Sequence, residues 1–271
     1  MNSDARNTMI VIVIALIVIV GGFLAISYSS GVKPPFTVVE SHSMQHCSLD
    51  DKESRIGNID TGDLILVRSP DKTDITTYVE GYQNGYEMFG DYGDVIVYKR
   101  PAGNPVIHRA FLWLNYNGDG TWTADALKDY DSSLWDNGGN AYNELSGTVT
   151  FYKVGNVVEG GKTVTIDLNA MLSMGSTQGY LTIGDSVNNM YFDQMSGIYP
   201  ALVDGNIKSV AWKEIPWLGA IKLIAKHNKT ELDTWAPNTT PLLVCELLTV
   251  ILIFIALNYL FSEIMYLRRK Q

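Results

Sequence analysis

The stretch GDVIVYKRPAGNPVIHRAFLWL, from Gly93 to Leu114, holds two apolar runs separated by a Pro- and Gly-rich segment. Val and Ile fill the runs and turn-forming residues bound them, which is typical of β-strands. Similar short runs follow one another from Phe36 onward. No ten-residue segment in this region shows a clean 3.6-residue, helical periodicity. The sequence therefore predicts a mainly β, antiparallel, barrel-like domain. Its expected strands are Phe36–Val39, Leu64–Val67, Val95–Lys99, Val106–Leu114, Thr121–Ala124, Thr148–Val154, Thr163–Leu168, Tyr180–Ile183 and Lys208–Trp212.

Two stretches are predicted to be surface insertions, residues 71–92 and about 125–147, where Asp, Asn, Gly and Ser dominate. The run NYNGDG from Asn115 to Gly120 superficially resembles the start of a calcium loop. Its first ligand is Asn rather than Asp, and Ala126 replaces the closing glutamate that such a loop requires. We expect a hairpin turn there.

An uncharged apolar segment, TMIVIVIALIVIVGGFLAI, runs from Thr8 to Ile26. About 20 apolar residues in a helix cross a bilayer core of roughly 30 Å. The segment therefore predicts a transmembrane helix over residues 8–28. A cleaved signal peptide is the alternative, with Ala25-Ile26-Ser27 as a faint small-x-small cleavage site.

A second apolar segment covers residues 242–262 and precedes a basic tail, 263–271, that contains Leu267-Arg268-Arg269-Lys270. The positive-inside rule then predicts a cytoplasmic C-terminus. Glu246 lies in the first turn of the segment, where its carboxylate can reach the membrane interface. A core helix of a soluble protein is the alternative. If both segments span, residues 29–240 lie outside the cytoplasm and the protein is a two-span protein of the cell membrane.

Composition narrows the function classes. The net charge of −9 and the lack of a basic cluster in the β-rich region speak against nucleic acid as a partner. Two cysteines, Cys47 and Cys245, cannot build a disulfide framework. The sequons Asn228-Lys229-Thr230 and Asn238-Thr239-Thr240 fit an external location.

Candidate catalytic residues lie in three separate stretches. ESHSMQH, from Glu40 to His46, holds two serines, and a serine hydroxyl needs a neighbouring base to become a nucleophile. His108 projects from an expected strand, and histidine is the default general base at neutral pH. Asp185 lies in the turn after the strand YLTI, where an aspartate can orient an imidazole, and Asp193 follows shortly after. By spacing alone the pattern is weak, because serine-rich loops and Gly-Asp turns are common.

Taken together and in order, these stretches resemble the type I signal peptidases, in the branch found in archaea and the endoplasmic reticulum. The resemblance covers roughly residues 36–70, 92–112 and 178–223. It rests on the boxes Ser41-His42-Ser43-Met44, Gly62-Asp63-Leu64-Ile65-Leu66, Gly93-Asp94-Val95-Ile96-Val97-Tyr98, Pro105-Val106-Ile107-His108-Arg109, Leu181-Thr182-Ile183-Gly184-Asp185 and Ile215-Pro216-Trp217-Leu218-Gly219.

The resemblance implies an S24/S26-type catalytic domain and a serine endopeptidase that removes signal peptides from preproteins at the membrane. It implies Ser43 as nucleophile and His108 as general base, with the Ser43 N–H and the Ser41 hydroxyl as oxyanion donors. Asp185 and Asp193 would be the acidic partners. It implies shallow pockets for small residues at the first and third positions before the cut. It implies no cofactor or metal, and it makes the protein translocation channel a further candidate partner beside preproteins and the lipid bilayer.

Two departures from the family pattern affect the site. His46 stands where the family has proline, so His42 and His46 both lie close to the nucleophile in sequence. In an extended segment, period-two alternation would point His42 away from Ser43. The second departure is the pair Ser186-Val187, which separates Asp185 from Asn188-Asn189 and Asp193. We therefore expect Asp193 to orient His108, with Asp185 in support.

The sequence also allows other interpretations. A catalytically inactive, membrane-anchored β-domain that binds or scaffolds is the main alternative, and intact Ser43 and His108 speak against it. A self-cleaving regulator of the repressor type is remote, because the chain has no DNA-binding motif. The aromatic stretch from Trp212 to Ile224 fits either the headgroup layer, where tryptophan is favoured, or the barrel core.

Overall fold

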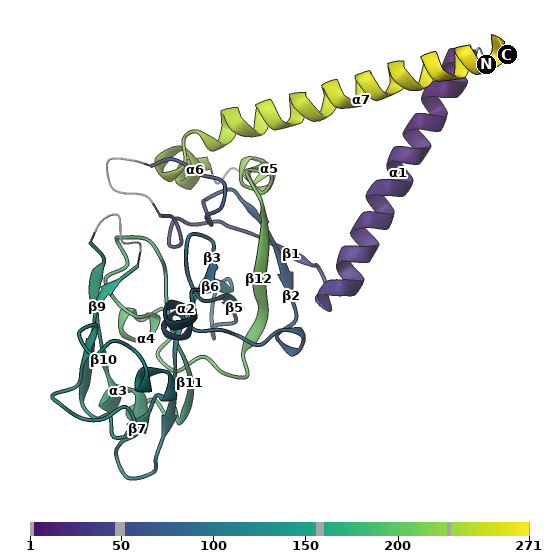
Figure 1. The fold of residues 1–271 in the computed structure, drawn as a ribbon. Helices are drawn as coiled ribbons and strands as arrows, with labels where there is room; N and C mark the ends of the chain where they lie inside the picture. Colours follow the sequence, from purple (N-terminus) through teal and green to yellow (C-terminus); the bar gives the residue numbers. More distant parts are fainter. Residues whose placement is uncertain (1–2, 47–51, 156–159, 227–228, 271) are drawn as a thin grey trace.

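The computed structural model describes residues 3–46, 52–155, 160–226 and 229–270 (Figure 1). Cys47 and Asn228, the first residue of one sequon, lie outside the described residues. Cys245 is a free, exposed cysteine on the C-terminal helix.

The principal sheet is antiparallel and follows the order β1-β2-β12-β5-β6-β11, with β7 paired to β6. Its strands are β1 (Phe36–Val38), β2 (Leu64–Arg68), β5 (Val95–Tyr98), β6 (Val106–Tyr116), β7 (Trp122–Thr123), β11 (Gln178–Ile183) and β12 (Ile207–Ile215). Each falls on an expected strand, with ends shifted by up to three residues. The expected hairpin turn after Asn115 is confirmed, since Asn115 pairs with Thr123.

The expected barrel is not closed. Within the described residues, no pairing joins β1 to β11, so the sheet stays open. The outer edge of β11 is taken instead by an isolated bridge between Tyr180 and Val203, while β1 is only three residues long. The coarser prediction of a mainly antiparallel β-domain is confirmed.

A lobe built largely from residues 125–173 packs against this sheet (Figure 1). The lobe contains a three-stranded sheet of order β10-β9-β8, whereas β3 and β4 pair as a separate two-stranded hairpin. The described elements between β2 and β11 that lie outside the principal sheet are η1 (Pro70–Lys72), α2 (Tyr78–Asn84), β3 (Glu87–Met88), β4 (Asp91–Tyr92), η2 (Asp125–Lys128), β8 (Trp135–Asp136), β9 (Thr148–Val154), β10 (Lys162–Asp167) and α3 (Leu168–Ser173).

The largest hydrophobic core joins the lobe to the principal sheet. Phe111 of β6 lies edge to face with Phe151 of β9 at 4.9 Å and with Phe192 at 5.0 Å. The stretches predicted as surface insertions also contribute buried side chains, including Val79 and Leu145. These stretches are therefore part of the packed domain as well as of its surface.

Two helices are long and apolar enough to span a membrane: α1 (Ser3–Ser30) and α7 (Thr239–Lys270). Their apolar stretches cover 26 and 29 residues, about 39 and 43 Å of helix. They contain the predicted segments 8–28 and 242–262. Figure 1 shows them meeting near the two chain termini and diverging toward the β-domain.

Three short helices complete the chain: α4 (Asp193–Ser196), α5 (Ala220–Ala225) and α6 (Lys229–Trp235). The last two connect β12 to α7 and lie beside the start of that helix (Figure 1). Trp212 and Trp217 are half-buried, and Trp217 donates its indole N–H to Ser54 Oγ at 3.0 Å. Neither tryptophan is a fully buried core residue.

Candidate active site

A cavity of about 620 Å³ is lined by the residues that the sequence predicts as nucleophile and base. Ser41, Ser43 and His108 all line it. Short aliphatic side chains form much of its wall, and the charged residues that line it are Glu40, Arg100, Lys222, Lys226 and Glu231. The aliphatic lining residues are Val38, Val97, Pro105, Val106, Ile107 and Ile198.

The segment that carries Ser43 is a turn just after β1. The Gln45 N–H donates to His42 O at 3.1 Å, and Met44 is fully buried beneath the turn. Ser43 Oγ lies 3.3 Å from Ser41 Oγ, and no hydrogen bond joins it to His108. In the described chain the Ser43 N–H has no hydrogen-bond partner, so this donor is open to an incoming acceptor.

His108 is held from behind by Asp193. The imidazole is 2% exposed, and its Nδ1 lies 2.8 and 2.7 Å from the two carboxylate oxygens. Asp193 also accepts hydrogen bonds from the Tyr98 hydroxyl at 2.6 Å and from Thr182 Oγ1 at 2.7 Å. Burial raises the pKa of Tyr98, which keeps the phenol a donor. With the proton on Nδ1, the His108 Nε2 atom is left as a base on the cavity side.

Asp185 has other partners. Its carboxylate accepts from Arg109 Nε at 2.9 Å and from a second guanidinium nitrogen, and it lies 3.0 Å from His46 Nε2. Burial raises the pKa of Asp185, but the charge of Arg109 and these hydrogen bonds outweigh burial and hold the pKa well below its usual range. The expectation that Asp185 supports His108 is therefore not met by a direct contact.

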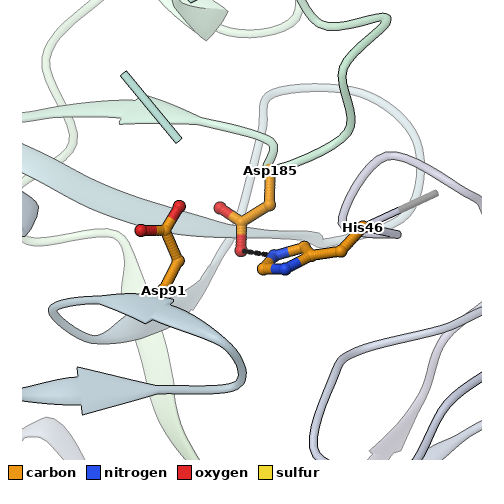
Figure 2. Close-up of side chains that lie close together, drawn as sticks. All are labelled: His46, Asp91 and Asp185. Carbon is orange, nitrogen blue, oxygen red and sulfur yellow. Dashed lines mark hydrogen bonds and ion pairs between the residues drawn. The ribbon is translucent and has the colours of Figure 1, made fainter. Parts of the chain in front are cut away.

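Figure 2 shows His46 and Asp185 pointing toward one another with the Asp91 carboxylate beside them. One ligand atom from each of the three lies within 4.8 Å of the others, a spacing that could hold a metal ion. Arg109 already supplies positive charge to Asp185, however, and donates to the carbonyls of residues 91–93. We interpret the cluster as a buried ion network that fixes the loop after β11.

That loop also contacts the turn that carries Ser43. The Ser43 carbonyl accepts from Ser186 N at 3.0 Å and from Asn189 Nδ2 at 2.7 Å. A Cβ atom built at Gly184 would collide with Ser43 O and Asn189 Nδ2 and lie 3.0 Å from His108 Nε2. Glycine is therefore required at position 184 for the two halves of the site to approach each other.

The other side of the turn that carries Ser43 is held by α6. His42 stacks on Trp235 with ring centroids 3.8 Å apart, and its Nδ1 lies 3.2 Å from Glu231 Oε2. Gln45 Nε2 donates to Trp235 O. The imidazole of His42 is thus engaged with α6.

Several site residues were not predicted from the sequence. Tyr98 and Thr182 lie inside quoted boxes, but only their strand pairing across the sheet brings them to Asp193. Lys162 lies in an unmatched stretch and donates to the loop after β11. No local pattern indicates these contacts.

Comparison of the chain with protein-family models, with curated proteins and with solved structures found no match.

Proposed function

We propose that this protein is a membrane-bound serine endopeptidase, a type I signal peptidase that removes N-terminal signal peptides from secreted preproteins. The observation that carries the proposal is the arrangement around one cavity. An imidazole backed by a carboxylate shares that cavity with a serine whose N–H has no partner among the described residues. The ordered boxes in the sequence and the mainly antiparallel β-domain support the finer assignment to the S24/S26-type fold.

In the proposed reaction, Ser43 Oγ attacks the scissile carbonyl carbon while His108 Nε2 takes the hydroxyl proton. The imidazolium is stabilised by Asp193, whose carboxylate is held by Tyr98 and Thr182. The C–N bond then breaks, and His108 returns the proton to the leaving amine. Water, deprotonated by the same imidazole, hydrolyses the acyl-enzyme and regenerates the serine.

Ser43 must turn from Ser41 toward His108 for this step, a rearrangement that substrate binding commonly brings about in such sites. The developing oxyanion would accept from the Ser43 N–H and the Ser41 hydroxyl. Removing one such donor typically costs about 2.7–4 kcal/mol of transition-state stabilisation. The aliphatic wall of the cavity suits small substrate side chains.

We further propose that α1 and α7 both span the cell membrane with residues 29–240 outside the cytoplasm. The start of α1 and the end of α7 lie together, away from the β-domain, as two antiparallel spans require (Figure 1). The basic residues after position 267 favour the cytoplasmic side. The site follows α1 closely, since β1 begins at Phe36 and α1 ends at Ser30. A signal peptide in the bilayer would thus end near the cavity.

The test is cleavage of a signal-peptide-bearing preprotein by the full chain in detergent, with the new N-terminus read by mass spectrometry. Ser43→Ala and His108→Ala should each abolish cleavage, whereas Ser132→Ala, at an exposed serine of the lobe, should leave it unchanged. Cleavage by the Ser43→Ala protein at the wild-type rate would overturn the proposal and favour a non-catalytic anchored β-domain.

A further inference from the structure

Lys162 extends from the lobe to the loop after β11. It is the first residue of β10, and its ammonium donates to Gly184 O at 2.9 Å and to Ser186 O at 3.1 Å. Ser186 belongs to the pair that departs from the family pattern. The lobe stretch that contains Lys162 is also unmatched, so an unmatched side chain binds one residue of that departing pair.

The two carbonyls that Lys162 binds belong to residues in contact with the predicted catalytic pair. Ser186 donates its N–H to Ser43 O at 3.0 Å, so one residue links the ammonium to the nucleophile's backbone. Gly184 lies against Ser43 O and His108 Nε2. A shift of the loop would therefore change the position of Ser43 relative to the imidazole.

The charge of Lys162 strengthens these two hydrogen bonds, and its burial makes that charge dependent on pH. Burial lowers the pKa of Lys162 to about 8, while Asp185, Asp91 and Asp193 favour its charged form and Arg109 opposes it. A charged donor forms hydrogen bonds roughly twice as strong as a neutral one. Near neutral pH the ammonium is present, and above pH 8 it is progressively lost.

We propose that Lys162 is a positioning residue that holds the 184–189 loop, and through it Ser43, in register with His108. The consequence for the reaction rests on the function proposed above, whereas the effect on the loop does not. A lysine that merely attached the lobe would affect stability without changing the order of the loop or the pH profile of catalysis.

The first measurement is hydrogen–deuterium exchange of the full chain in detergent at pH 7. In Lys162→Met, which keeps the length of the side chain but not its donors, the Ser186 amide should exchange about tenfold faster. Lys162→Arg should keep most of the protection. Lys128→Met, at an exposed lysine of the lobe, is the matched control and should match wild type. Wild-type exchange at Ser186 in folded Lys162→Met protein would overturn the inference.

The second measurement is preprotein cleavage by the same proteins across pH 6–10. Lys162→Met should lower kcat about tenfold at pH 7 with KM nearly unchanged. Wild-type kcat should fall toward the Lys162→Met value above pH 8, and Lys162→Arg should move that fall to higher pH. An alkaline limb that is identical in all three proteins would contradict the positioning role. If wild type cleaves no preprotein although Ser186 exchange responds as expected, the proposed function fails and the loop assignment stands.

Discussion

Replacement of Asp193 by asparagine tests the catalytic arrangement most directly. Three donors converge on this carboxylate: His108 Nδ1, the Tyr98 hydroxyl and Thr182 Oγ1. An asparagine has one acceptor oxygen, and its NH₂ group must face at least one of these donors. If that group faces His108, the imidazole proton moves to Nε2, and the atom that should accept the Ser43 proton is blocked.

The magnitude follows from this loss of the correct tautomer. The same substitution in a serine–histidine–aspartate triad lowers kcat about 10⁴-fold, which is about 5.4 kcal/mol at 1.36 kcal/mol per tenfold. We expect a loss of at least 10³-fold for Asp193→Asn, with KM little changed. The assay is preprotein cleavage by the full chain in detergent, at a temperature where circular dichroism shows the variant folded.

Asp185→Asn is the informative comparison, because Asp185 contacts Arg109 and His46 instead of His108. Removing one partner of a buried ion pair costs about 3–5 kcal/mol of stability. Protein that remains folded should keep kcat within about tenfold of wild type. Asp129→Asn, at an exposed lobe position, is the control for charge loss alone. Equal, mild losses from the Asp185 and Asp193 variants would refute an orienting acid at either position.

Three further outcomes are expected. Gly184→Ala should abolish cleavage, because the added methyl group displaces Asn189 and the nucleophile carbonyl; wild-type kcat in this variant would contradict the close approach. Burial raises the pKa of Glu214 to about 7, so the folded state favours its protonated form; stability from this group falls as pH rises from about 4.5 to 7 and is constant above. Glu214→Gln should therefore remove about 1 kcal/mol, after solvent screening, of the fall in unfolding free energy between about pH 4.5 and 7; an unchanged slope would exclude this assignment. Trp235→Ala should remove the stacking partner of His42 and lower kcat about tenfold, with less effect in protein that already carries His42→Ala.

The elements could be predicted from sequence more fully than their connections. All nine expected strands are present, because Val, Ile and Tyr runs between turn residues mark strands locally. Closure of a barrel was wrongly expected, since pairing order depends on which edges meet. At the outer edge of β11, where β1 would have to pair to close a barrel, Tyr180 forms a bridge with Val203 instead.

The same division holds for the site. The preference for Asp193 over Asp185 could be reached from the two-residue insertion at Ser186, and the 2.7 Å contact with His108 agrees with it. The partners of Asp185 could not be predicted, because His46 lies 139 positions away and no periodicity links them. Lys162 was missed for the same reason.

The pairing of β2 with β12 bears on when the chain acquires its shape during synthesis. Residues 64–66 of β2 lie opposite 213–215 of β12, near the end of the β-domain. Contacts so distant along the chain form late, after loop closure between distant segments. Most of the polypeptide must therefore be synthesised before all the residues that line the cavity are in place. A nascent or prematurely terminated chain is accordingly expected to lack the proposed peptidase activity.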